Sequence, residues 1–309
     1  MGKVQQIPPP LRPGDVVGIA APAGQIVDQK RFQRGVAILA DLGFEPRFPR
    51  EMWPGPGYLA DTDRRRAQEL HELIADPEVA AIIAARGGYG CLRLLAHCDT
   101  SLWRQHPKAL VGFSDISALL NHVVQQTGLL CFHGPVVTSL ADLSRDGLER
   151  FYACLTGNWQ RTISPSRLEV LRADQKVAQG PLIGGNLSTL MTLIGTPYDV
   201  DWHGCIVVLE DVGEPLYRLD RMLTQLALAG KLQQVAGLVL GDFTLNNNQE
   251  LREKIRSTEY VWQRVLDLSK DGDFPVWGNF PAGHCPENLT LPLGAWASMD
   301  SGRGLLSFR

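Results

Sequence analysis

The first half of the chain alternates short apolar runs with longer segments in which apolar residues recur at helical spacing. Continuous apolar runs at residues 15–23, 79–85 and 109–113 predict buried strands, because a strand covered on both faces shows no polar alternation. Helices are predicted over residues 28–43, 62–76 and 114–128. This alternation is typical of a mostly parallel sheet with helices on both faces, so the sequence predicts an α/β fold.

The alternation weakens between residues 148 and 179, where short strands and turns are expected. Beyond it the predicted elements are a glycine turn entering a helix at 184–197, a strand at 204–214, a helix at 218–230, a strand at 235–243, and short strands within 274–300 and 304–309. Strands outnumber helices here, which predicts a smaller mixed α/β domain. Because domains are roughly 100–200 residues long, we divide the chain into an N-terminal domain (1–150), a linker (151–178) and a C-terminal domain (179–309).

Charge and composition restrict the class of partner. The formal net charge is −3 and 20% of the residues are charged, so no basic surface indicates a nucleic acid, and a small molecule is the expected partner. The apolar run near the start of the chain is too short and too interrupted for a signal peptide or a membrane span, which predicts a cytoplasmic protein with no membrane partner. The six cysteines are scattered through mostly apolar segments and are expected to be reduced, buried thiols.

A serine lies at the joint between a predicted strand and a predicted helix. In an open parallel sheet, ligands bind at the carboxyl ends of the strands, and Ser114 follows such a strand directly. This is the arrangement of a nucleophile elbow, in which the next backbone N–H, that of Asp115, can face a developing oxyanion. The generic G-x-S-x-G pattern is incomplete because Ile116 replaces the second glycine. The alternative is that Ser114 is only the N-cap of the helix.

Adjacent glycines end the preceding predicted strand, in the segment ARGGYG at residues 85–90. Gly87 or Gly88 could supply a second oxyanion donor, because glycine lets a backbone approach a ligand closely. The alternative is a tight turn between strand and helix. The phosphate-binding pattern GxxxxGK[ST] is absent and GxGxxG does not fit this segment, so a nucleotide cofactor is not expected.

A nucleophilic serine needs a base, and the base needs a group that orients it. Glu210 ends an apolar run, where a carboxylate is costly unless it is paired or lies at the strand end, and Asp211 should point to the opposite side. Of the seven histidines, His284 stands in a turn after Gly283, but the sequence pattern alone does not favour it over His133. The motifs HExxH and CxxC are absent, so no metal is expected and a side chain must provide the nucleophile.

Seven segments between Leu11 and about Asp300 resemble, in the same order, the motifs of the LD-carboxypeptidases, serine peptidases also called muramoyltetrapeptide carboxypeptidases. The segments are LRPGDVVGIAAPAG, ARGGYG, GFSDISALL, GGNLSTLMTLIGTP, VVLEDVGEPLYRLDRMLTQL, LVLGDF and GHCPENLTLPLG. Each motif alone is weak, but seven in register are difficult to obtain by chance.

The resemblance implies a triad of Ser114, Glu210 and His284, with an oxyanion hole formed by the backbone of Asp115 and Gly88. It also implies a flavodoxin-like or class I amidotransferase-like N-terminal domain, a swivelling β/β/α C-terminal domain, and usually a homodimer. The implied reaction, which uses no cofactor, releases the terminal D-alanine from murein tetrapeptides during recycling of cell-wall fragments, so the implied partner is a small peptide or muropeptide.

The group that binds the free terminal carboxylate is left open. Arg86, with Gly87, is a candidate because it adjoins the glycine turn, although an arginine paired to a structural acid is an equal alternative. Two other functions remain: a microcin-immunity-type peptidase of the same family, and a two-domain protein that binds a small ligand without catalysis.

Overall fold

The computed structural model describes residues 5–50, 52, 57–173, 177–244 and 250–309. The chain forms two compact units. The first unit contains residues 1–159, 195–200 and 286–294, and the second contains residues 160–194, 201–285 and 295–309. Helix α7 (Arg145–Leu155) therefore crosses the boundary expected at residue 150, and two short segments from the second half of the chain belong to the first unit.

The first unit is built on a six-stranded sheet with the order β11-β5-β4-β3-β1-β2. Its strands are β1 (Val16–Ala20), β2 (Glu45–Arg47), β3 (Val79–Ala84), β4 (Ala109–Gly112), β5 (Cys131–His133) and β11 (Leu291–Leu293). Strands β1 to β5 are parallel in the flavodoxin-like order 2-1-3-4-5, and β11 adds an antiparallel edge. The residues of β1 and β4 are buried throughout, which explains their continuous apolar sequences.

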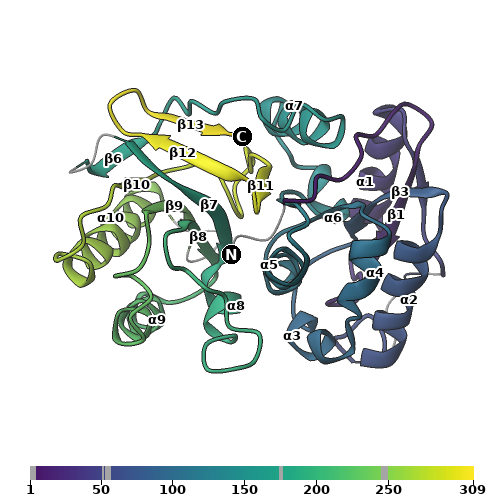
Figure 1. Cartoon of the computed structure of the whole chain (residues 1–309), viewed down its shortest axis with the longest axis horizontal. Coiled ribbons are helices and arrows are strands. Elements are labelled where there is room, and N and C mark those ends of the chain that lie inside the picture. The colour runs from purple at the N-terminus through teal and green to yellow at the C-terminus, as the bar shows by residue number, and fades with distance from the viewer. Residues whose placement is uncertain (1–4, 51, 53–56, 174–176, 245–249) are drawn as a thin grey trace. The chain divides into compact units, whose positions relative to one another are not determined.

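Helices cover both faces of this sheet, as the right-handed connections between parallel strands require. One face carries α1 (Gln29–Asp41), α6 (Val137–Leu140) and α7. The other carries α2 (Asp63–Ala75), α3 (Cys91–Leu94), η1 (Leu95–His97), α4 (Thr100–Gln105) and α5 (Ile116–Thr127), as Figure 1 shows. The loops after β3 and β4 therefore lie at the same edge of the sheet, because both are carboxyl ends of parallel neighbours.

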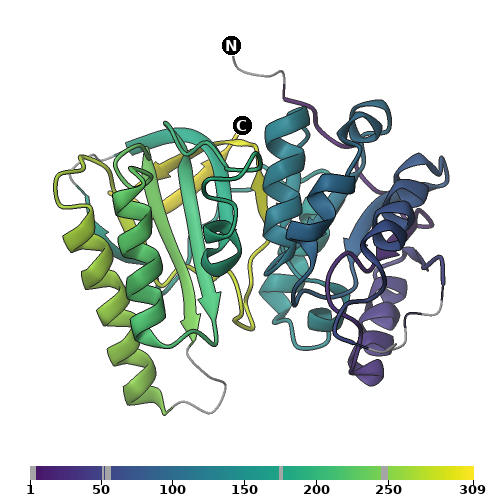
Figure 2. The same cartoon turned by 90° about the horizontal axis from the view of Figure 1, so that it is seen from below.

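The second unit is built on a seven-stranded mixed sheet with the order β13-β12-β7-β8-β9-β10-β6. Its strands are β6 (Glu169–Arg172), β7 (Val177–Asn186), β8 (Ile206–Val212), β9 (Gly237–Thr244), β10 (Val276–Gly278), β12 (Trp296–Asp300) and β13 (Leu305–Phe308). Strands β7 to β10 are parallel, and the outer strands are antiparallel. Helix α8 (Leu187–Met191) follows β7, and Figure 2 shows α9 (Leu216–Leu228) and α10 (Leu251–Leu268) side by side across one face.

Besides the short helices α3, η1, α4 and α6, two longer helices, α7 and α10, were not among the elements expected from the sequence. In α10 the buried positions Ser257, Val261 and Val265 recur every four residues, and the helix is as amphipathic as α1, so its helical period is present in the sequence and was missed. Helix α7 is nearly as amphipathic as α1, but its buried residues include Gly147 and Arg150, which hydrophobicity alone does not place in a core.

The predicted α/β class, with a parallel sheet first and a mixed sheet second, is confirmed. The glycine turn expected before α8 is instead the end of strand β7.

No disulfide links the six cysteines, four of which are buried. None of the helices in the described ranges is both long and apolar enough to cross a membrane.

Candidate active site

Ser114 occupies a strained turn between β4 and α5. Its φ is +62°, a left-handed conformation that costs a non-glycine residue about 1–3 kcal/mol and is concentrated at functional sites. Gly112 makes this turn possible, because a Cβ there would lie 2.7 Å from Cγ2 of Ile116. The isoleucine that breaks the generic elbow pattern thus packs against the glycine at the strand end.

The Gly87–Gly88 turn lies directly against Ser114. A Cβ on Gly87 would lie 2.8 Å from Cβ and 2.9 Å from Oγ of Ser114, so only glycine fits at this position. Gly88 has a φ of +112°, which glycine adopts without strain. The structure therefore brings together three of the residues singled out in the sequence, and both candidate oxyanion donors belong to turns at the same edge of the sheet.

Arg86 binds the backbone of the turn that contains it. Its Nη1 donates to the carbonyl of Gln25 at 2.8 Å, and its Nε donates to the carbonyl of Gly87 at 3.2 Å. The N–H of Gly24 donates to the same Gly87 carbonyl. The guanidinium thus fastens the loop after β1 to the glycine turn, a structural role that the sequence could not distinguish from carboxylate binding.

In the second unit, Glu210 and His284 form a hydrogen-bonded pair. Oε2 of Glu210 lies 2.7 Å from Nδ1 of His284, and the glutamate side chain is fully buried while 22% of the histidine side chain is exposed. A proton on Nδ1 directed at the carboxylate leaves the basic lone pair of a neutral imidazole on Nε2. This is the orientation that a general base requires from its carboxylate partner.

The surroundings favour the protonated form of His284. Burial lowers its pKa, but the charge of Glu210 and the hydrogen bond to it raise the pKa, and the charges of Asp211 and Asp242 add to this effect. The net result is a raised pKa. His133, the alternative base, lies fully buried on β5 with its ring edge toward Phe113, 6.2 Å between ring centroids.

Asp211 binds a different set of partners from Glu210, as expected for the next residue of a strand. Its carboxylate accepts hydrogen bonds from Nδ2 of Asn186 at 3.1 Å and from the N–H and Oγ of Ser188 at 2.8 and 2.7 Å. Burial raises the pKa of Asp211, and the hydrogen bonds from Ser188 oppose the shift. Asn186 and Ser188 were not predicted from the sequence; their position just after the two glycines of β7 is the only signal that could have indicated them.

Gly283 gives Glu210 the room it needs. A Cβ on Gly283, whose φ is +102°, would lie 2.5 Å from Oε2 of Glu210 and 2.7 Å from its Cβ. We expect Gly283→Ala to displace the carboxylate, to destabilise the protein by about 1–3 kcal/mol, and to lower turnover by about 10²-fold through misplacement of His284. Thermal unfolding and the activity assay described below measure the two effects.

Gly204→Ala is the matched control for this variant. Gly204 also has a positive φ, +67°, but nothing lies within 4 Å of a Cβ built on it. The control therefore carries the backbone strain without the crowding. Equal turnover in the two variants would show that Gly283 has no special role beside Glu210.

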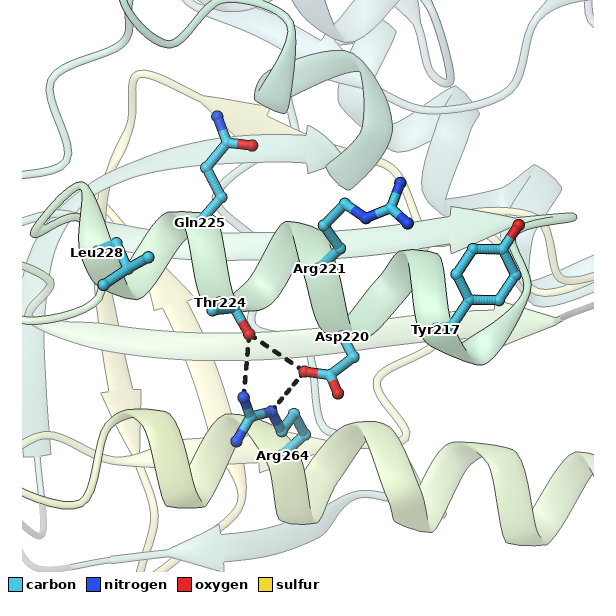
Figure 3. Close-up of a pocket in the computed structure, with 7 residues that line it drawn as sticks. All are labelled: Tyr217, Asp220, Arg221, Thr224, Gln225, Leu228 and Arg264. Atoms are coloured by element: carbon cyan, nitrogen blue, oxygen red, sulfur yellow. Dashed lines mark hydrogen bonds and ion pairs between the residues drawn. The ribbon is translucent and has the colours of Figure 1, made fainter.

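In the part of the chain that the structure describes, no group of three or more histidine, cysteine, aspartate or glutamate side chains could hold a metal ion. A surface groove between α9 and α10 is shown in Figure 3 and contains none of the candidate catalytic residues. There Arg264 of α10 ties the two helices together, because its Nε donates to Oδ1 of Asp220 at 2.6 Å and its Nη2 donates to Oγ1 of Thr224 at 3.0 Å.

The sequence matches known protein families over most of its length. Residues 17–134 match the LD-carboxypeptidase N-terminal domain, and residues 179–299 match the LD-carboxypeptidase C-terminal domain. A probable murein peptide carboxypeptidase of Bacillus subtilis is 36% identical over 95% of this chain and 91% of its own. A murein tetrapeptide carboxypeptidase of Pseudomonas aeruginosa is 34% identical over 80% of each chain. The Microcin C7 self-immunity protein MccF of Escherichia coli is 28% identical over 94% of this chain and 92% of its own.

Solved structures agree with the sequence matches. An MccF-like protein from Bacillus anthracis superposes with a TM-score of 0.85 at 26% identity, covering 98% of this chain and 99% of that one. A muramoyltetrapeptide carboxypeptidase from Oxalobacter formigenes gives a TM-score of 0.77 at 29% identity, covering 95% and 97%. The resemblance that the sequence motifs carry is confirmed, and the chain belongs to the LD-carboxypeptidase family.

Proposed function

We propose that this protein is a serine-type L,D-carboxypeptidase that releases the terminal D-alanine from murein tetrapeptides. The observation that carries the proposal is the conformation of Ser114: its φ is positive, and Gly87 lies close against its Oγ. The Glu210–His284 pair supports it, because a buried carboxylate hydrogen-bonded to a partly exposed imidazole is the other half of a serine peptidase triad. The names of the murein-active relatives support the substrate.

The proposed reaction has two halves. Oγ of Ser114 attacks the scissile carbonyl as Nε2 of His284 accepts its proton, and the backbone N–H groups of Asp115 and Gly88 stabilise the oxyanion. His284 then returns the proton to the departing amine of D-alanine, which leaves an acyl-enzyme on Ser114. A water molecule, deprotonated by His284, attacks the acyl group, and the serine is regenerated. Glu210 stabilises the imidazolium in both halves.

The proposed context is recycling of cell-wall fragments in the cytoplasm by a homodimer. Free tetrapeptide and muropeptide both present the same L,D bond, so either can be the substrate. Arg86 and Gly87 are proposed to lie near the terminal carboxylate of the substrate, because Gly87 lies against Ser114 and Arg86 precedes Gly87 and binds its carbonyl.

The second candidate is a microcin-immunity-type peptidase, and the similarity to MccF and to an MccF-like structure favours it. Such an enzyme would cleave an aminoacyl or peptidyl nucleotide with the same triad. A third candidate, a protein that binds a small ligand without catalysis, requires no nucleophile and predicts that Ser114 can be replaced without loss of function.

One assay separates these candidates. The purified protein is incubated with L-Ala-γ-D-Glu-meso-diaminopimelate-D-Ala, with and without EDTA, and in parallel with an aminoacyl sulfamoyl nucleoside. Alanine release from the tetrapeptide in both conditions is the expected result. Release only from the nucleoside conjugate would favour the microcin-immunity type, and no release from either would favour the binding protein. Loss of activity with EDTA would contradict a mechanism without metal.

The raised pKa of His284 predicts the pH dependence of the reaction. His284 must be neutral to accept the proton of Ser114, so activity is lost as the pH falls through the pKa of His284. Because that pKa is raised from 6.5, the midpoint of the acidic limb of kcat/KM is expected above 6.5. The profile of D-alanine release against pH measures this midpoint. An acidic limb centred below 6.5 would show that the base is not in the environment described for His284.

A further inference from the structure

We propose that the carboxylate of Asp115 is a positioning group that ties the turn of Ser114 to the Gly87–Gly88 turn and so sets both backbone donors of the oxyanion hole. This inference rests on the proposed function, and it assigns a role to the side chain of a residue whose backbone N–H is one of the two donors. All the contacts that carry it lie within the first unit.

A single hydrogen bond joins the two turns. Oδ2 of Asp115 accepts the N–H of Cys91 at 2.8 Å, and both residues are buried, with Asp115 5% exposed and Cys91 fully covered. Asp115 follows Ser114 directly, and Cys91 follows Gly88 by three residues. The contact therefore links the segment that carries the nucleophile to the segment that carries the second oxyanion donor.

This contact differs from the usual role of an aspartate at its position. Asp115 is the N-cap of α5, where an aspartate normally accepts an N–H from the first turn of its own helix, yet its side chain makes no such bond. Helix α3 begins at Cys91, and its N-cap, Gly90, has no side chain to offer. Asp115 supplies the acceptor that α3 lacks, and it joins two elements instead of capping its own.

Arg66 binds the same loop through the carbonyl of Gly90. This buried arginine of α2 donates through Nη1 to the carbonyl of Gly90 at 3.1 Å and also to that of Pro22, and it pairs with Asp63. A Cβ on Gly90 would lie 2.9 Å from the same Nη1. Arg66 thus fixes the carbonyl of Gly90, and the bond from Cys91 to Asp115 links the same loop to the turn of Ser114.

The consequence for catalysis follows from the geometry of an oxyanion hole. Donors must lie about 2.7–3.1 Å from the oxyanion, and a misplacement of about 1 Å costs about 10²-fold in rate. In addition, Ser114 keeps its strained φ only because its surroundings fix it, and the side chain of the next residue is one such constraint.

We call the hydrogen bond from the N–H of Cys91 to the carboxylate of Asp115 the tether. The tether requires an acceptor oxygen more than it requires a negative charge. Burial raises the pKa of Asp115, while the N–H of Cys91 and the charge of Arg66 favour the ionised form. Asparagine presents the same oxygen at the same distance from the backbone, and it serves as well as aspartate in capping. Asp115→Asn should therefore preserve the tether, and Asp115→Ala and Asp115→Ser should remove it.

The test compares kcat and KM of D-alanine release in these variants with a matched control. In Asp99→Ala, a carboxylate that accepts the N–H of Ser101 at 2.9 Å is lost from the N-cap of α4. We expect Asp115→Ala and Asp115→Ser to lower kcat by about 10²-fold with KM near that of the wild type, because the oxyanion forms only in the transition state. Asp115→Asn should stay within about threefold of the wild type, and Asp99→Ala should be unchanged.

Amide hydrogen exchange at Cys91, measured on the same proteins, decides the structural step independently of activity. Loss of the acceptor should speed this exchange about tenfold or more in Asp115→Ala or Asp115→Ser, and not in Asp115→Asn. An undiminished kcat in folded Asp115→Ala or Asp115→Ser, or unchanged amide exchange at Cys91 in these variants, would overturn the inference. An inactive wild type would defeat the proposed function alone, since exchange at Cys91 would still decide whether the tether exists. If the alanine variant fails to fold, the serine variant provides both measurements.

Discussion

Replacement of Ser114 by alanine is expected to lower kcat for D-alanine release by about 10⁶-fold, because loss of the nucleophile of a serine triad removes nearly all of the catalysis that the triad supplies. Mass-spectrometric detection of released alanine measures the effect. Ser101→Ala, which removes a serine hydroxyl from α4 in the same unit, is the control and should retain full activity.

The strain at Ser114 adds a second readout to this experiment. Ser114→Gly loses the same hydroxyl but relieves the left-handed backbone, so it should be more stable than Ser114→Ala by roughly 1 kcal/mol. Chemical denaturation of both variants gives the difference. An alanine variant that keeps appreciable turnover would exclude Ser114 as the nucleophile, and equal stability of the two variants would show that the positive φ stores no strain.

Replacement of Glu210 by glutamine is expected to cost about 10⁴-fold in kcat, because the amide allows the wrong tautomer of His284 and cannot stabilise its cation. The Glu210 carboxylate also raises the pKa of His284, so the acidic limb of kcat/KM should move to lower pH in the variant. Steady-state kinetics across the pH range measure both effects.

The control for Glu210→Gln is Glu169→Gln, at an exposed position on β6 in the same unit. It should leave both turnover and the pH profile unchanged. A Glu210→Gln variant with wild-type turnover would mean that the 2.7 Å contact with His284 has no role in the reaction.

The strands of the first sheet were predictable because burial on both faces leaves an uninterrupted apolar sequence. The residues of β1 and β4 are covered throughout, and the pattern identified both strands and placed Ser114 at the end of one of them. Strand β7 was harder to predict from the sequence. Its last three residues are Gly184, Gly185 and Asn186, and because a glycine pair with positive φ is typical of turns, the end of this strand resembles a loop.

The partners in the candidate site depend on contacts between residues far apart in the chain. His284 and His133 both border apolar segments, and they are distinguished by the contact of His284 with Glu210, 74 positions away, and by the burial of His133. The same holds for Asp115, whose sequence position indicates capping of its own helix although its carboxylate binds Cys91. Local pattern determines which side chains stand at strand ends, but tertiary structure determines which of them meet.

The proposed reaction requires Ser114 to be a nucleophile that His284 activates. The most direct measurement is the rate at which an alkyl fluorophosphonate modifies the intact protein, with the modified residue identified by mass spectrometry. A single adduct on Ser114 is expected, and it should form more slowly in His284→Ala by about 10²-fold or more, since a general base contributes about 10²–10⁴-fold. No adduct on Ser114, or the same rate with and without the histidine, would contradict this mechanism.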